Sequence, residues 1–200
     1  MRSSLVGTHP DVSPLLNERV QRAKLLEAMV QVVAEKGYDA ATVADAVRLA
    51  RVSRGTFYAL FDSKRACFGA AYTLGTEVLE ARIDDAVAGA ADWRDELRLG
   101  LRTFLRTLAE EPRFARVYLL EADAVADLRD AALRRFARRY GKSFARSGRP
   151  VPPDEALFVL AAGIDQLACA RLRAGEPVTD LEDTLVGCAV RLAAKEEAWT

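Results

Sequence analysis

Few residues of the chain have the chemistry that nucleophilic or metal-dependent catalysis requires. His9 is the sole histidine, and it lies in an N-terminal segment rich in Ser, Gly and Pro that we expect to be a mobile tail. A Ser-His-Asp or Cys-His arrangement would have to recruit this tail. The sequence also contains no glycine-rich phosphate loop and no H-E-x-x-H zinc motif. We therefore expect a protein that is not an enzyme and that has no metal or cofactor.

The three cysteines, Cys67, Cys169 and Cys188, lie far apart in the sequence and form no C-x-x-C pair. This spacing does not suit a structural zinc site or a disulfide framework. Reduced, mostly buried thiols are the simplest interpretation, and a thiol-based redox sensor is the alternative.

The overall composition is that of a globular protein. The 200 residues are 50% hydrophobic and 29% charged, and 29 Lys and Arg balance 29 Asp and Glu. The neutral total gives no indication of a nucleic-acid partner. No apolar run approaches the roughly 18 residues of a membrane-spanning helix, and the N-terminus has no signal-peptide pattern. We therefore expect a soluble, cytoplasmic protein without a membrane partner.

The charge is unevenly distributed along the chain. Residues 129–149 contain seven Arg and one Lys, against Asp130 alone. We interpret this basic segment as a solvated helix face that pairs with acidic residues elsewhere in the chain. An acidic effector and a second DNA contact are the alternatives.

Hydrophobic periodicity predicts an all-α fold. Apolar residues repeat at helical spacing, and residues suited to N-caps stand where helices are expected to begin. The predicted helices cover about 17–36, 43–50, 54–60, 64–88, 93 to beyond 108, 112–121, 124–146, 153–173 and 179–198.

The second and third predicted helices, joined by Arg51 and Val52, form a helix-turn-helix pattern. The second helix of such a pair must bury one side and leave the other free to enter a major groove. Phe57, Leu60 and Phe61 can provide the buried side together with Val52. The residues near its N-terminus that remain available to DNA are Arg54, Gly55, Thr56 and Tyr58.

The stretch from Thr42 to Lys64 resembles the DNA-binding signature of the TetR family of bacterial transcriptional regulators, above all in V-S-R-G-T-F-Y-A-L-F-D-S-K at 52–64. The resemblance covers residues 17 to about 71, and the remainder matches only in helix count, length and order. It implies a nine-helix, all-α architecture in which three N-terminal helices bind DNA and a C-terminal bundle binds a ligand and dimerises. The expected division is a tail at 1–16, a helix-turn-helix domain at 17–62 and a ligand-binding and dimerisation domain at 63–200.

The resemblance also implies roles for individual residues at the DNA. Thr42 matches a position that holds a phosphate at a helix N-terminus, although capping alone would also explain it, as it would Ser53. Arg54 is the candidate for reading a guanine, because its fork can contact O6 and N7 together. Arg51 stands where the family usually has glycine, so we expect backbone strain that a phosphate contact offsets, or a turn of different shape. The expected DNA contacts are Thr42, Arg51, Ser53, Arg54, Gly55, Thr56, Tyr58 and Lys64.

The same resemblance places an effector pocket among the fourth to eighth helices. The candidates are polar or aromatic residues on otherwise apolar faces, and ordinary core packing is the alternative for each. Asp165 is the sharpest case, because an unpaired carboxylate on that face would be costly to bury. It either binds a donor in a pocket or pairs with an arginine. The expected ligand-binding residues are Tyr72, Phe104, Phe114, Tyr118, Glu121, Asp165, Gln166 and Cys169.

The last two predicted helices carry apolar stripes and small residues, so two copies of the chain would make a four-helix dimer interface. Two-fold symmetry predicts a palindromic double-stranded operator with half-sites about 34–36 Å apart. The leading hypothesis is a dimeric repressor that an unidentified small-molecule effector releases from its operator. The alternatives are a helical small-molecule-binding or interaction module with vestigial DNA binding, and a cysteine-based redox sensor.

Overall fold

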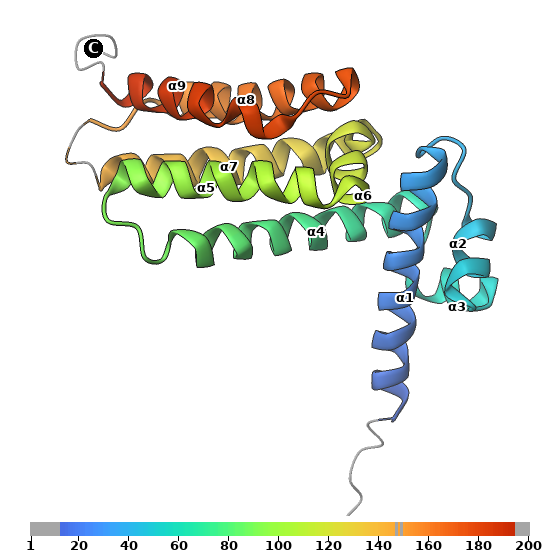
Figure 1. The fold of residues 1–200 in the computed structure, drawn as a ribbon. Coiled ribbons are helices and arrows are strands. Elements are labelled where there is room, and N and C mark those ends of the chain that lie inside the picture. Colours follow the sequence, from blue (N-terminus) through green and yellow to red (C-terminus); the bar gives the residue numbers. More distant parts are fainter. Residues whose placement is uncertain (1–12, 147, 149, 195–200) are drawn as a thin grey trace, which may run out of the picture.

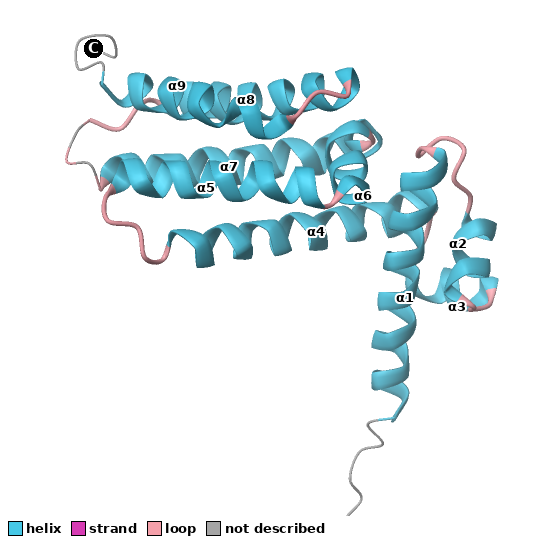
Figure 2. Cartoon of the chain, viewed as in Figure 1, coloured by secondary structure: helices cyan, strands magenta, loops and turns pink. Residues whose placement is uncertain are grey.

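The computed structural model describes residues 13–146, 148 and 150–194, and within these ranges the chain is helical and contains no strand (Figures 1 and 2). The predicted all-α architecture of nine α-helices is confirmed for this part of the chain. None of its helices is long and apolar enough to cross a membrane. The helices are α1 (Ser13–Lys36), α2 (Val43–Ala50), α3 (Arg54–Leu60), α4 (Lys64–Val87), α5 (Trp93–Glu110), α6 (Pro112–Ala115), α7 (Ala126–Ala145), α8 (Asp154–Ala174) and α9 (Glu182–Ala194).

Figure 1 shows α1, α2 and α3 as a head at one end of a layered body formed by α4 to α9. Helix α4 leaves the head and forms one outer layer, on which α5 and α7 pack as the middle layer. Helix α8 packs on α7, and α9 packs on α5, to complete the other outer layer. Helix α4 therefore belongs to both parts, because its first turns contact α1 and its remaining turns line the body.

A continuous hydrophobic core joins the head to the body. Met29, Phe57 and Phe68 have fully buried side chains that lie in α1, α3 and the start of α4. The same cluster extends into the body through Leu105 and Val117. The apolar contacts that fix the head on α4 are thus continuous with those that hold the body together.

The starts of four helices follow from single capping side chains. The Thr42 hydroxyl accepts the Asp45 N–H at 3.1 Å, and the Ser53 hydroxyl accepts the Thr56 N–H at 2.9 Å. Ser63 and Asp92 cap α4 and α5 in the same way. Each cap satisfies a backbone donor that has no partner inside its helix, so these boundaries were predictable from the sequence.

Other boundaries differ from the prediction. Helix α1 begins at Ser13 rather than residue 17, because Pro14 is tolerated in a first helical turn. The rest of the expected tail, 1–12, lies outside the described residues. The predicted helix 112–121 is α6 followed by a π-helical turn, and the helices predicted from 124 and 179 each begin with a 3₁₀ turn. The short turns are Arg116–Leu120 (π), Ala122–Val125 (3₁₀) and Val178–Leu181 (3₁₀).

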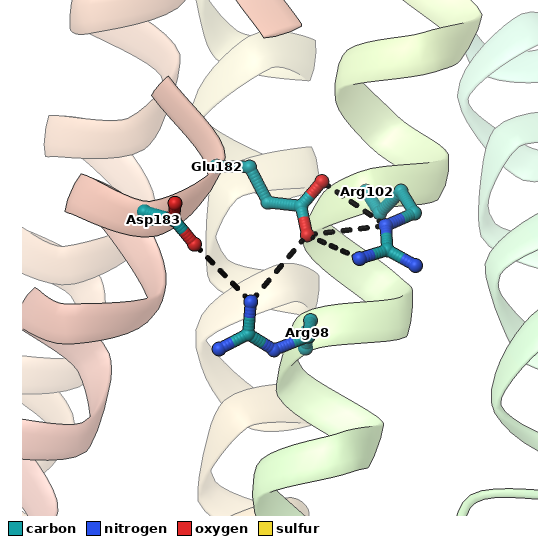
Figure 3. A network of polar contacts seen from close by, with 4 residues as sticks. All are labelled: Arg98, Arg102, Glu182 and Asp183. Atoms are coloured by element: carbon teal, nitrogen blue, oxygen red, sulfur yellow. Dashed lines mark hydrogen bonds and ion pairs between the residues drawn. The ribbon is translucent and has the colours of Figure 1, made fainter. Parts of the chain in front are cut away.

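A cluster of charged side chains attaches α9 to α5 (Figure 3). The Arg102 guanidinium donates to both carboxylate oxygens of Glu182, with distances of 2.7 to 3.1 Å, and Arg98 donates to Asp183 at 3.2 Å. The hydrogen bonds from Arg102 hold the pKa of Glu182 below its usual range. Because the arginines are about 40% exposed, solvent screening keeps the energetic contribution modest, and the cluster mainly fixes the register of the two helices.

The turn between α2 and α3 adopts a backbone shape that favours glycine. Arg51 has φ 56° and ψ 44°, and it is the sole non-glycine residue with positive φ in the described part of the chain. The expected strain at Arg51 is thereby confirmed, and the glycine-type turn is retained despite the substitution.

We predict that Arg51→Gly stabilises the fold by about 0.5–1 kcal/mol. Relief of about 1–2 kcal/mol of left-handed strain outweighs the roughly 0.4–1 kcal/mol that glycine adds to the entropy of the unfolded chain. Urea unfolding followed by circular dichroism measures the change. Arg51→Ala is the matched control, because it removes the side chain but keeps the Cβ. Equal stability of the two variants would contradict the prediction.

Candidate functional site: an exposed recognition helix and an internal cavity

Helix α3 buries one side and exposes the other, as predicted. Phe57 is fully buried and Phe61 is 5% exposed, and their rings pack 5.8 Å apart between centroids. On the opposite side, Arg54 and Gly55 are exposed and Tyr58 is 50% exposed. The N-terminal turn of α3 therefore presents a guanidinium, a bare backbone segment and a phenol to solvent.

The hydroxyls expected at the DNA are also used within the fold. Thr42 Oγ1 accepts the first-turn N–H of α2 and donates to the Asp45 carboxylate at 2.8 Å. Ser53 Oγ lies 2.9 Å from Thr56 Oγ1 while it caps α3. Capping accounts for Thr42 and Ser53, and both residues remain exposed.

Asp45 connects α2 to the end of α1. Its carboxylate lies 2.9 Å from Lys36 Nζ and 2.7 Å from the Arg48 guanidinium. The hydrogen bonds from Lys36 and Thr42 hold the pKa of Asp45 at about 2. The carboxylate is therefore ionised at neutral pH and keeps α2 in place against α1.

The loop between α1 and α2 is held by side chains from two other elements. Lys64, the first residue of α4, donates its ammonium to the carbonyls of Tyr38 at 2.8 Å and Ala41 at 3.0 Å. Glu121, at the end of the π turn, accepts the Tyr38 N–H at 2.8 Å. The expected phosphate contact Lys64 is thus half-buried and already holds this loop, with one of its three N–H groups left for another acceptor.

The body contains an apolar cavity among α4, α5, α6, α7 and α8. Its volume is about 70 Å³, equivalent to about two water molecules at roughly 30 Å³ each. A larger ligand can therefore enter only if side chains or helices move apart. Five of the expected ligand-binding residues line it, namely Tyr72, Phe104, Phe114, Tyr118 and Asp165.

Polar groups stand at the two ends of this cavity. Toward the head, Asp165 forms an ion pair with Arg129, and both side chains are less than 15% exposed. Burial raises the pKa of Asp165, and the hydrogen bond from Arg129 opposes that rise. At the far end, the buried Glu96 accepts hydrogen bonds from Ser143 at 2.7 Å and from Arg146 Nε at 3.0 Å. Asp165 thus pairs with an arginine, which was one of its two alternatives, and because it also lines the cavity, donor binding to a ligand stays a prediction.

A basic surface groove of about 430 Å³ adjoins the far end of the cavity, between α4 and α7. It shares Glu96 and Arg139 with the cavity wall. Arg135, Arg139 and Arg146 in the groove pair with Glu80, Asp84 and Glu96. The interpretation of the basic segment as a face that pairs with acidic residues is confirmed for these arginines. Arg138 and Lys142 have no ion-pair partner among the described residues.

Residues 25–71 match the family model for bacterial regulatory proteins of the tetR family. This segment is similar to the DNA-binding part of the TetR family. In sequence, the chain is 46% identical over 43 residues to the uncharacterised HTH-type transcriptional regulator YvdT of Bacillus subtilis (strain 168). This match covers 22% of this chain and 22% of the relative.

Several solved structures have a similar fold over most of this chain, and not only over the TetR-type segment. The fatty acid degradation regulator FadR from Bacillus halodurans has a TM-score of 0.74 at 19% identity, over 84% of this chain and 94% of that chain. FadR from Bacillus subtilis, solved in complex with stearoyl-CoA, has a TM-score of 0.74 at 18% identity, over 84% of this chain and 97% of that chain. A TetR-family protein from Syntrophomonas wolfei has a TM-score of 0.74 at 16% identity, over 91% of this chain and 99% of that chain.

Three residues expected in the effector pocket lie outside the cavity of this TetR-like fold. Glu121 points to the head, where it holds the Tyr38 amide. Gln166 is exposed on the outer face of α8. Cys169 is buried beside the Leu119 carbonyl, behind the cavity wall. Their helices do contact the cavity, but the face each residue occupies depends on packing that helical periodicity alone does not reveal.

The sequence also left some cavity residues unidentified. Arg129 could have been predicted as the partner of Asp165, because it begins the basic segment and a buried carboxylate requires a cation beside it. Glu96 and Ser143 gave no such signal, since each resembles an ordinary polar residue on an amphipathic helix. Their hydrogen bond joins α5 to α7 across 47 residues of sequence.

Two of the three cysteines are poorly placed for a redox role. Cys67 and Cys169 are buried, and Cys188 is exposed. Burial raises the pKa of Cys67 to about 12 and also raises the pKa of Cys169. Because the thiolate is the reactive form, the two buried thiols are unreactive at neutral pH. The described residues contain no cluster of three or more His, Cys, Asp or Glu side chains suited to a metal.

We predict that Gly75→Ala destabilises the protein by about 1–2 kcal/mol. Alanine normally favours a helix by about 1 kcal/mol over glycine, but a Cβ at Gly75 would lie 2.0 Å from Tyr118 Oη. Such overpacking costs about 1–3 kcal/mol. In a Tyr118→Ala background the clash is absent, so the same substitution should be neutral or stabilising. Urea unfolding of the four proteins tests this cycle, and equal effects in both backgrounds would refute it.

Proposed function

We propose that the protein is a dimeric transcriptional repressor that binds operator DNA through α3 and releases it when an effector occupies the cavity. The observation that carries this proposal is the exposed N-terminal turn of α3 within a matched TetR-type domain. Because α4 links that domain to the cavity, a ligand that parts the body helices can change the position of α3.

Arg54 is the residue we assign to base recognition. It lies in the first turn of α3, it is exposed, and no other side chain of the described chain engages it in an ion pair. A Cβ added at Gly55 would meet only Ser53 Oγ, at an ordinary contact distance of 3.5 Å. Packing within the fold therefore does not require glycine at this position. A close approach of DNA to the backbone does explain it. The remaining contacts, to phosphates, would come from Thr42, Arg51, Ser53, Thr56, Tyr58 and Lys64.

The outer face of α8 supports a homodimer. Val159 is 69% exposed and Leu167 is 44% exposed, and they lie on one helical face with Gly163, Gln166 and Ala170. Small and apolar residues at this spacing allow a second copy to pack closely. Helix α9 would complete the interface beside α8. A two-fold axis there would present two copies of α3 to a palindromic operator.

The cavity and its adjoining groove favour an amphiphilic effector. The cavity wall is mainly aliphatic and aromatic, whereas the groove at its far end carries Arg135, Arg138 and Lys142. An apolar chain in the cavity would place an anionic head among these cations. The similar fold of Bacillus subtilis FadR holds stearoyl-CoA, and we infer an acyl-CoA or a related anionic lipid for this protein.

We predict that Arg54→Ala weakens discrimination between the preferred operator and other DNA by about 1–3 kcal/mol, because a bidentate guanine contact is lost. The operator comes from selection among random duplexes, and titration by fluorescence anisotropy measures the affinities. Lys142→Ala is the matched control, since it removes a cation from the body and should leave DNA binding unchanged. Selection that yields no preferred duplex would refute the repressor and favour a ligand-binding module with vestigial DNA binding.

We predict that Val159→Asp converts the dimer to monomer, because it would bury an unpaired carboxylate in each half of an apolar interface. Sedimentation equilibrium measures the mass. Val78→Asp, which places the same charge at an exposed valine of α4, should leave the dimer intact. A dimer that survives Val159→Asp would exclude this face as the interface.

A further inference from the structure

A second surface groove, of about 290 Å³, lies between α1, α4 and α6 on the head side of the cavity. It is lined mostly by apolar side chains, including the half-exposed Leu74 and Val78. Phe114 and Tyr118 line both this groove and the cavity. These two aromatic rings are therefore part of the wall between the cavity and the groove, at the end opposite the basic groove.

The contacts of Tyr118 are suited to displacement. Its ring stacks on Phe114 with centroids 4.2 Å apart, and its hydroxyl donates to the Ala71 carbonyl at 2.9 Å. The absence of a side chain at Gly75 lets the ring lie directly against the α4 backbone. The Ala71 carbonyl lies within α4, where it also serves as an acceptor for the helix ladder. Moving the ring away therefore breaks one neutral hydrogen bond and leaves no charge unpaired.

Tyr118 shares a turn with the residue that holds the head. The Glu121 N–H donates to the Arg116 carbonyl at 3.1 Å, which closes the π turn around Tyr118. The Glu121 carboxylate accepts the Tyr38 N–H in the loop that leads into α2. A Cβ at Gly37 would lie 3.4 Å from the same carboxylate, so the contact is close. Tyr118 and the carboxylate that holds the α1–α2 loop are therefore carried by the same short turn.

The length of the cavity sets which ligands reach this ring. Its lining residues on α4 run from Val87, beside the basic groove, to Tyr72, beside Tyr118. Fifteen residues of α-helix separate them, or about 22 Å at 1.5 Å per residue. The basic groove also extends back along α4 to Glu80 and Arg135, whose charges pair with each other. This length therefore applies to a chain whose anionic head lies beside Lys142, one turn beyond the Arg139–Asp84 ion pair, and such a chain must be nearly that long to touch Tyr118.

We infer that Tyr118 is the specificity-determining residue that measures effector chain length: a chain long enough to displace its ring pulls Glu121 from Tyr38 and so releases DNA. This inference rests on the proposed function, and it names chain length as the feature of the effector to which the repressor responds. Shorter chains occupy the same cavity, leave Tyr118 in place and do not release DNA.

The test compares octanoyl-CoA and stearoyl-CoA on the selected operator. For the wild-type dimer, stearoyl-CoA should weaken DNA affinity by about 5–150-fold, the usual range of allosteric coupling, and octanoyl-CoA should bind with less than a twofold effect. With Tyr118→Ala the long chain meets no ring, so stearoyl-CoA should still bind but change DNA affinity less than twofold. Tyr118→Phe keeps the ring but removes its hydrogen bond to Ala71, so the ring is easier to displace. This variant should release DNA with shorter chains than the wild type requires.

Two further variants separate the sensing residue from its connection to the head. Glu121→Ala should bind stearoyl-CoA with wild-type affinity but lose the DNA response, whereas Glu121→Gln keeps an acceptor oxygen and should retain it. Glu77→Ala, which removes an exposed carboxylate of α4 that lines neither groove nor cavity, is the matched control and should behave as wild type. A full DNA response of Tyr118→Ala to stearoyl-CoA would overturn the inference and leave the repressor function standing.

Hydrogen exchange gives a second readout that requires no ligand. In the free protein, the Tyr38 amide should exchange faster in Glu121→Ala and in Tyr118→Ala than in Glu121→Gln. Unchanged exchange in both alanine variants would refute the connection through the π turn. Failure of the wild type to bind either thioester would instead refute the acyl-CoA effector of the proposed function, and the exchange result would still decide the connection.

Discussion

The α1–α2 loop is held through the two backbone groups of one residue, Tyr38. Its carbonyl accepts the Lys64 ammonium from α4, and its N–H donates to Glu121 from the π turn. A part-buried backbone donor or acceptor without a partner costs free energy comparable to a lost hydrogen bond, so both side chains stabilise the loop in this position. The α1–α2 loop is thus a junction at which a side chain of the body contacts the segment that leads into α2.

Most of the head was predictable because its determinants are local. Thr42, Ser53 and Ser63 each cap a helix through a backbone N–H three residues ahead, which is a relation visible in the sequence. The buried side of α3 followed from the spacing of its aromatic residues. The strained backbone at Arg51 followed from a departure at a glycine position, and the structure retains the turn that glycine favours.

The cavity was predictable only in part, because its wall is assembled from five helices. Tyr72, Tyr118 and Asp165 were identified as polar or aromatic residues on apolar faces, and they do line it. Gln166 satisfied the same criterion and lies on the outer face of α8. Periodicity specifies that a helix has an apolar face, but its orientation around its own axis depends on which neighbours it packs against. The orientation is set by tertiary packing, so the sequence did not identify Glu96 and Ser143 as cavity residues either.

The π turn has a consequence for how this segment can vary in evolution. A π turn accommodates one residue more than the α-helical turn it replaces, and each residue of an α-helix advances its side chain by about 100°, from 3.6 residues per turn. Deleting one residue between Arg116 and Leu120 would restore a regular helix and rotate Glu121 by that angle, away from Gly37 and Tyr38. Relatives with a one-residue gap at this place in an alignment would keep the fold, the cavity and α3, but they would lose the contact between this turn and the α1–α2 loop.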